Sequence, residues 1–165
     1  MMRYTKLIVL TLAIVLTLTI SIKMQYQEEH IEFYVIRHDK ENMIKATKEL
    51  SFTESDMESY NWKSHEIVFT QKFIDDNNVD LTEELLIEGG SKVLDCNGND
   101  KFIVFVNNEK IYEGIFEPSM YQSYLPEGPI LSDTKNGVEI SVHWGDDPRS
   151  NEKLYEALRN NKLLK

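Results

Sequence analysis

The chain has 165 residues, of which 41% are hydrophobic and 28% are charged, which is typical of one folded domain with a short extension. Its 28 acidic side chains outnumber 18 basic ones, and the net charge of −10 disfavours binding to the phosphates of nucleic acids. Cys96 is the only cysteine, which excludes an intramolecular disulfide, and we expect it to be a buried structural side chain.

The N-terminal segment is the strongest single feature of the sequence. Residues 7–22 form a run of 16 residues without a charge, preceded by Arg3 and Lys6. As a helix this run spans roughly 24 Å, close to the thickness of a bilayer core. We therefore predict a membrane anchor or uncleaved signal over residues 1–24, a spacer over 25–30 and a folded domain over 31–165.

The charges around this segment predict its orientation. Arg3 and Lys6 precede the apolar run, whereas the residues that soon follow it include Glu28, Glu29 and Glu32. The positive-inside bias then places the domain outside the cell membrane, as a single-pass protein. Cleavage after the apolar run would instead give a secreted protein, but Ile22 and Lys23 make a poor cleavage site.

The first half of the domain is predicted to alternate strands with short helices. Thr53 and Asp56 have the spacing of a capping box and predict a helical turn over residues 53–59, while Thr70 caps a second helix. Leu81, Leu85 and Leu86 fall at helical spacing before two glycines. Strands rich in β-branched and aromatic residues are predicted at 31–37, 50–53 and 66–70.

The second half is predicted to hold a hairpin, a further strand and a terminal helix. A strand over 101–106 turns at Asn107-Asn108 and returns over 111–116, and a loop follows over 117–128. Strict alternation predicts a strand over 138–144, and Asp147-Pro148 has the pattern of a cap followed by a first helical residue. The predicted fold class is α+β: an antiparallel-rich sheet with helices packed on one face, preceded by a single N-terminal transmembrane helix.

Two resemblances accompany this pattern. The stretch from Leu50 to Phe116, with its Thr-capped acidic turn and its hairpin, resembles the periplasmic head subdomain of SecD-type translocase subunits. The chain also resembles uncharacterised membrane-anchored bacterial proteins that share three short motifs: Tyr60-Asn61-Trp62, Ile111-Tyr112-x-Gly114 and Asp147-Pro148-Arg149. Both resemblances imply an extracytoplasmic location and an α+β fold, and neither carries over a transport activity.

The patterns of familiar catalytic and cofactor sites are missing from the sequence. It contains no nucleophile elbow, phosphate-binding loop or dinucleotide fingerprint, so we expect no cofactor. The stretch 95–100 alternates oxygen-bearing residues around Gly98, but Val106 stands where a calcium loop needs a bidentate glutamate, which favours a polar turn. The four histidines do not have the spacing of a metal site, so no metal ligand is predicted.

Two clusters are the candidates for binding. Tyr121 and Tyr124 lie in a loop between two prolines, where tyrosines offer a large contact area, although tyrosines that close the core are the favoured alternative. Trp144 and Arg149 lie between the last strand and the last helix. A structural role is favoured for this segment, since Arg149 can pair with Asp146 while Asp147 and Pro148 start the helix.

These observations favour a membrane-tethered extracytoplasmic domain that binds a protein or another envelope component over an enzyme. The first alternative is a small extracytoplasmic hydrolase with His38, Asp39 and His143 as its reacting groups. The second is an accessory subunit of a membrane assembly, held in the complex by the anchor helix itself.

Overall fold

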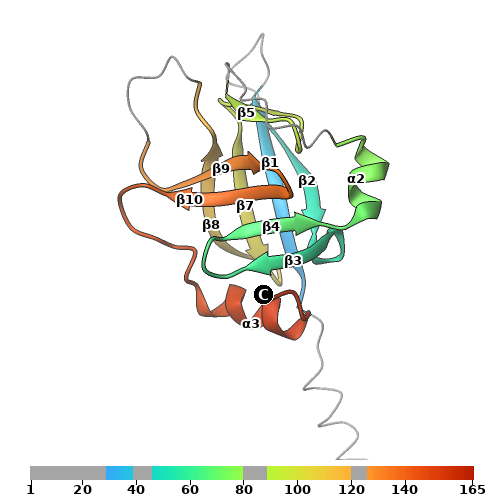
Figure 1. The fold of residues 1–165 in the computed structure, drawn as a ribbon. Helices are drawn as coiled ribbons and strands as arrows, with labels where there is room; N and C mark the ends of the chain where they lie inside the picture. Colours follow the sequence, from blue (N-terminus) through green and yellow to red (C-terminus); the bar gives the residue numbers. More distant parts are fainter. Residues whose placement is uncertain (1–28, 39–45, 80–88, 120–125) are drawn as a thin grey trace, which may run out of the picture.

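One curled, eight-stranded sheet makes up most of the protein (Figure 1). The computed structural model describes residues 29–38, 46–79, 89–119 and 126–165. In chain order the elements are β1 (Ile31–His38), β2 (Ala46–Thr53), the 3-10 turn η1 (Glu54–Asp56), β3 (Met57–Asn61), β4 (Glu66–Phe69), α2 (Gln71–Asn77), β5 (Gly90–Ser91), β6 (Cys96–Asn97), β7 (Lys101–Val106), β8 (Glu109–Phe116), β9 (Pro129–Thr134), β10 (Gly137–Val142) and α3 (Glu152–Asn160).

The strand order explains the curl. The sheet runs β2-β1-β7-β8-β9-β10-β4-β3, and its pairings are antiparallel except for the parallel pair β8–β9. The two outermost strands, β2 and β3, are joined in sequence by the three residues of η1. Because this connection is so short, the two edges of the sheet must lie near each other. In Figure 1 the strands β3, β4, β9 and β10 cross in front of β1, β2, β7 and β8.

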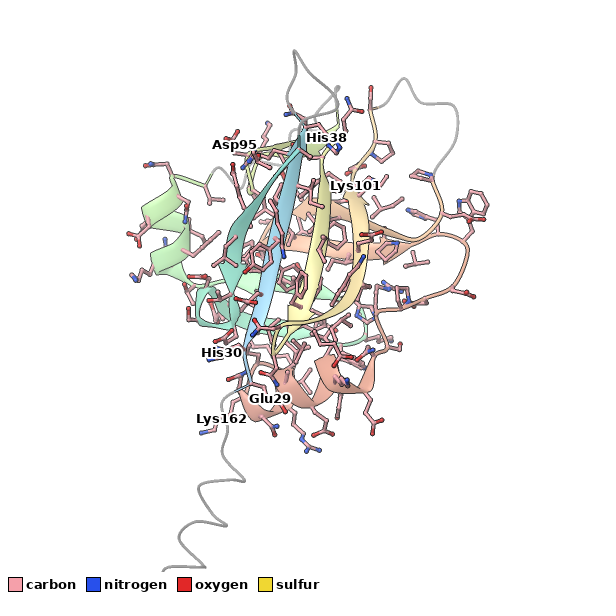
Figure 2. All side chains as sticks on the ribbon, turned by 180° about the vertical axis from the view of Figure 1, so that it is seen from behind. Glu29, His30, His38, Asp95, Lys101 and Lys162 are labelled. Atoms are coloured by element: carbon pink, nitrogen blue, oxygen red, sulfur yellow. The ribbon has the colours of Figure 1, made fainter. Side chains whose placement is uncertain are left out.

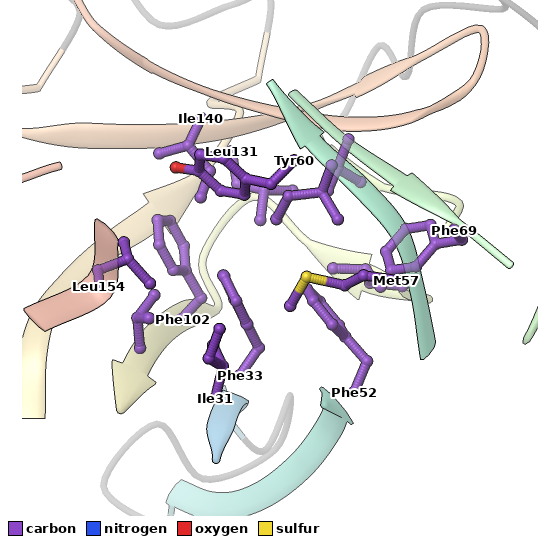
Figure 3. Packing of buried hydrophobic residues seen from close by; sticks show 14 of the residues in the cluster. Ile31, Phe33, Phe52, Met57, Tyr60, Phe69, Phe102, Leu131, Ile140 and Leu154 are labelled. Carbon is purple, nitrogen blue, oxygen red and sulfur yellow. The ribbon is translucent and has the colours of Figure 1, made fainter. Parts of the chain in front are cut away.

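The core lies inside the curl. Along β1 the buried residues alternate as Ile31, Phe33 and Val35, the period expected of a strand with one inward face. Phe52 on β2 stacks on Phe33, with ring centroids 4.3 Å apart, and meets the edge of Phe69 on β4 at 4.9 Å. Aromatic rings from both walls therefore fill the interior (Figure 3).

The two helices occupy different places around the curl (Figure 1). Helix α3 contacts β1 and β7 and closes one end with Leu154, Ala157 and Leu158, which are all fully buried. Helix α2 directly follows β4, and its Phe73 stacks on Phe69 at 4.4 Å. The coarser prediction, a sheet-rich and mainly antiparallel fold with helices, is confirmed.

The structure bears out most of the predicted elements. The strands predicted over 31–37, 66–70, 101–106, 111–116 and 138–144 correspond to β1, β4, β7, β8 and β10, and the short strand predicted over 50–53 is the end of the longer β2. Asn107 and Asn108 both adopt positive φ in the β7–β8 turn, as their turn chemistry predicts. Thr70 caps α2 by accepting from the Phe73 N–H at 3.2 Å.

Two predictions at helix ends are wrong. The capping box of Thr53 and Asp56 is present, but the helix stops after one 3-10 turn and β3 follows, because Met57 and Ser59 alternate inward as strand residues. Helix α3 starts at Glu152 rather than at Pro148, and its cap is Asn151, whose side chain accepts from the N–H groups of Lys153 and Leu154.

The predicted anchor (residues 1–24) and the leucine-bearing helix (residues 81–86) lie outside the described residues, as does most of the spacer (residues 25–30). Neither helix in the part of the chain that the structure describes is long and apolar enough to span a membrane.

Candidate functional site

The three short motifs that the sequence singled out meet in the interior of the curl. Tyr60 comes from β3, Tyr112 from β8, and Arg149 from the segment that follows β10. Together with His65 and Asp147 they form the group that we call the tyrosine–histidine cluster. Tyr60 and Tyr112 are buried, and only 14% of the Arg149 side chain is exposed. The cluster is therefore a polar network that extends from the apolar core to the surface, where 41% of the Asp147 side chain is exposed.

His65 enters this network from a tight turn between β3 and β4. The Asn61 side chain accepts from the N–H groups of Lys63 and Ser64, at 3.0 and 3.1 Å, and this closes the turn. His65 ends the turn with φ of 57°, in the left-handed region that glycine or asparagine adopts more easily. This conformation directs the imidazole inward, where only 5% of the residue is exposed.

The His65 ring is held by aromatic side chains and one hydrogen bond. Its Nδ1 lies 2.9 Å from the Tyr60 hydroxyl, and its centroid lies 5.5 Å from that of Trp62. Burial, followed by the charge of Arg149, lowers the pKa of His65, while Asp147 partly opposes this shift. His65 is therefore neutral around neutral pH.

Arg149 ties the segment after β10 to the sheet. Its Nε and Nη2 donate to the two carboxylate oxygens of Asp147 at 2.8 and 2.7 Å, and its Nη1 donates to the Ile140 carbonyl at 2.6 Å. Hydrogen bonding from Arg149 lowers the pKa of Asp147 to about 2. The partner of Arg149 is thus Asp147, and the expectation of a pair with Asp146 is wrong.

The two tyrosines of the cluster are held in their protonated form. Burial raises the pKa of Tyr60, and burial together with the neighbouring Tyr60 phenol raises the pKa of Tyr112 well above its ordinary value. Tyr112 Oη is sealed from solvent and makes no hydrogen bond of normal geometry among the described residues. Both phenols stay protonated, and the cluster offers no ionised nucleophile to a substrate.

Of the other predicted binding residues, Trp144 is the one that lies in the described part of the chain. Trp144 is half exposed, and its carbonyl accepts from the Gly128 N–H at 3.4 Å, next to the start of β9. Tyr121 and Tyr124 lie outside the described residues.

The structure does not bring together the two described residues of the hydrolase hypothesis, His38 and His143. The His38 N–H donates to Asp100 Oδ1 at the end of β1, whereas His143 follows β10 and lies 3.5 Å from the Ser141 hydroxyl. Asp39 lies outside the described residues. In the described part of the chain, no hydrogen bond or ion pair joins the two histidines.

The stretch 95–100 forms a polar turn, as predicted. Asp100 is buried, and its second carboxylate oxygen accepts from the Asn97 N–H at 2.9 Å. Both of its oxygens therefore accept hydrogen bonds from backbone N–H groups, those of His38 and Asn97. Cys96 is buried as expected, and burial raises the pKa of its thiol to about 12. Within the described ranges, no group of three or more histidine, cysteine, aspartate or glutamate side chains could hold a metal ion.

A second candidate site, which we call the acidic groove, lies at the end of the molecule closed by α3. It is an open groove of about 420 Å³. Its lining comes from the start of the described chain, the β7–β8 turn and helix α3: Glu29, Val106, Asn107, Glu109, Glu152, Lys153 and Glu156. Four of the lining residues are glutamates and one is a lysine. Lys153 pairs with Glu109, and Arg159, next to the groove on α3, pairs with Glu156. No pattern in the sequence predicts this groove, because its residues are scattered from position 29 to position 156.

The groove lies next to the point where the described chain begins. The Asn161 side chain donates to the Glu29 carbonyl at 2.6 Å and holds this point against the end of α3. Figure 2 shows Glu29, His30 and Lys162 together at this end of the molecule, and His38 and Asp95 at the opposite end.

Comparisons with known proteins found no related family, curated protein or solved structure. The resemblances to SecD-type head subdomains and to membrane-anchored bacterial proteins therefore stay predictions.

Proposed function

We propose that this protein is a membrane-tethered extracytoplasmic binding domain, and that its acidic groove holds a cationic segment of a protein or of another envelope component. The observation that carries the proposal is the groove itself, in which four glutamates stand against two basic side chains in a space open to solvent: Lys153, which pairs with Glu109, and Arg159, which pairs with Glu156. Charge of one sign in a concave surface attracts ligands of the opposite charge and speeds their association.

The tether rests on the sequence of the N-terminal segment. Residues 7–22 have the apolar length of a short membrane helix, and the charges on either side predict a domain that faces outward. Since Glu29 lines the groove, only a few residues separate the groove from this segment. A ligand in the groove would then lie close to the membrane surface, where the basic juxtamembrane stretch of another membrane protein is within reach.

The filled interior supports binding at the surface. The largest fully buried side chains include Tyr60, Phe33 and Phe102, and aromatic rings occupy the space inside the curl. The groove, at about 420 Å³, falls within the size range of ligand sites in proteins.

The test is crosslinking in intact cells that express the tagged full-length protein. The groove variant carries Glu152→Gln and Glu156→Gln, and the matched control carries Glu58→Gln and Glu127→Gln at exposed positions outside the groove. Both variants remove two negative charges, so a general effect of net charge affects them equally.

We expect one specific partner to crosslink to the wild type and the control, and to be lost from the groove variant. The complex should also weaken as salt increases, since exposed charge pairs are screened. Equal crosslinking of both variants would refute the groove as the binding site. Recovery of the protein alone in every case would count against a binding function.

A further inference from the structure

His65 stands at a turn position whose backbone conformation disfavours histidine. A non-glycine residue at φ of 57° is strained, and asparagine or glycine would suit the conformation better. The imidazole is nevertheless held by two aromatic side chains, since it hydrogen-bonds to the Tyr60 hydroxyl and its ring centroid lies 5.5 Å from that of Trp62. Strain of this kind points to a role for the ring itself.

One backbone residue connects His65 to the segment that Arg149 holds. The Ile140 N–H donates to the His65 carbonyl at 3.1 Å, and the Ile140 carbonyl accepts from Arg149 Nη1 at 2.6 Å. The backbone of Ile140 thus links His65 on one side to the Arg149 side chain on the other.

The charges that face His65 favour a neutral ring. They come from Arg149 and Asp147 in the segment after β10, while β3 and β8 contribute the uncharged phenols of Tyr60 and Tyr112. An imidazolium at this position would be a second buried cation beside Arg149, and both cations would depend on the one carboxylate of Asp147. Burying an additional charge of this kind is costly.

We propose that the tyrosine–histidine cluster is a pH-sensitive switch, in which protonation of His65 weakens the hold of Arg149 on the sheet and releases residues 143–150. The released segment carries Trp144, so acidification changes the surface that this half-exposed tryptophan presents. The inference stands on the cluster alone and does not depend on the acidic groove.

The sign of the pH dependence follows from the environment of the ring. Because the pKa of His65 in the folded protein is lowered, the folded state binds this proton less readily than the unfolded chain does. The stability that the neutral ring contributes is fully present above about pH 6.5, the ordinary histidine pKa, and decreases below it until the folded-state pKa is passed. The switch therefore acts on the acidic side of neutrality.

The experiment measures the protonation of His65 and the opening of residues 143–150 in the full-length protein in mild detergent. In a Trp144→Phe background, the fluorescence of Trp62 reports the protonation of His65, because an imidazolium close to an indole quenches its emission. Hydrogen exchange followed by mass spectrometry reports the opening of residues 143–150 in the wild type. Both are recorded from about pH 8 to about pH 4, with exchange corrected for the intrinsic effect of pH.

We expect the quenching and the opening of residues 143–150 to share one midpoint below about pH 6.5, with exchange in that segment rising roughly tenfold. His65→Asn, which tolerates the positive φ and does not titrate, should abolish this response. His143→Asn, which removes a histidine within the segment itself, should retain it. Exchange that does not rise in the wild type, or that rises with a midpoint different from the quenching, would overturn the proposal even if His65→Asn failed to fold.

Discussion

Arg149 makes three side-chain hydrogen bonds, two to Asp147 and one to the Ile140 carbonyl. With only 14% of its side chain exposed, it needs these acceptors to compensate for the water it has lost. The Asp147 carboxylate also accepts from the Arg149 backbone N–H at 3.0 Å. The pair thus fixes a short turn and attaches that turn to β10.

Replacing Asp147 by asparagine tests this pair. Its pKa of about 2 lies below the ordinary value of 3.8, so pairing stabilises the fold above about pH 3.8 and the effect is lost as the pH falls towards 2. Asp147→Asn should lower the free energy of unfolding at pH 7 by about 1 kcal/mol or less, since 41% of the side chain is exposed and water screens the pair.

Urea unfolding at several pH values measures the difference between Asp147→Asn and the wild type, which should narrow below about pH 4. Asp146→Asn is the matched control, because it removes the adjacent carboxylate that the sequence proposed as the partner. If Asp146→Asn cost as much stability as Asp147→Asn, the assignment of the pair would be wrong.

At the scale of elements, α3 closes the end of the curled sheet. Its buried face consists of Leu154, Ala157 and Leu158, and its first turn is capped by Asn151. The acidic groove uses the opposite side of the same helix, through Glu152 and Glu156. The position of α3 therefore determines both the packing of the core at this end and the arrangement of the carboxylates.

The cap of α3 gives a prediction at this scale. Asn151→Ala removes the acceptor for the Lys153 and Leu154 N–H groups and should lower the free energy of unfolding by about 1 kcal/mol. Ser150→Ala, one residue earlier and exposed, should change it by less than about 0.5 kcal/mol. Denaturant midpoints compare the two variants, and equal effects would contradict the observed start of the helix.

Local patterns in the sequence predicted β1, β4, β7, β8, β10 and the end of β2, because alternation and turn residues act over a few positions, but they did not predict β9 (Pro129–Thr134). They failed at Asp147-Pro148, which has a helix-start pattern, because the Asp147 carboxylate is engaged by Arg149 and Asn151 supplies a cap closer to the helix. They failed again at Met57, where a real capping box is followed by inward alternation. In both places, contacts formed in the folded protein override the helix that the local sequence pattern predicts.

The candidate sites were less predictable than the elements. Tyr60, Tyr112 and Arg149 each stand in a motif, but only the order of strands in the sheet brings β3, β8 and the segment after β10 to one place. His65 carries no signal apart from an unusual residue type in a turn. The acidic groove assembles glutamates from both ends of the described chain, so no window of sequence contains it.

At the scale of the whole molecule, the two ends of the described chain lie near α3. Asn161 holds Glu29 in place, and Tyr60 on β3 exchanges backbone hydrogen bonds with Leu163 and Lys165 at 2.7 and 3.0 Å. The last residues thereby cover part of the β3 edge, which limits pairing with other chains. A tether at the N-terminal side would present the opposite end, with His38 and Asp95, away from the membrane (Figure 2).

The outward orientation of the domain is the central claim, and cysteine labelling in intact cells tests it most directly. Asn136→Cys places an accessible thiol in the exposed turn between β9 and β10, while the native Cys96 gives no background because it is buried and its thiol pKa is raised to about 12. A membrane-impermeant maleimide should label Asn136→Cys in intact cells as completely as after lysis, with the labelled protein recovered in the membrane fraction. Labelling that occurs only after lysis would contradict the account.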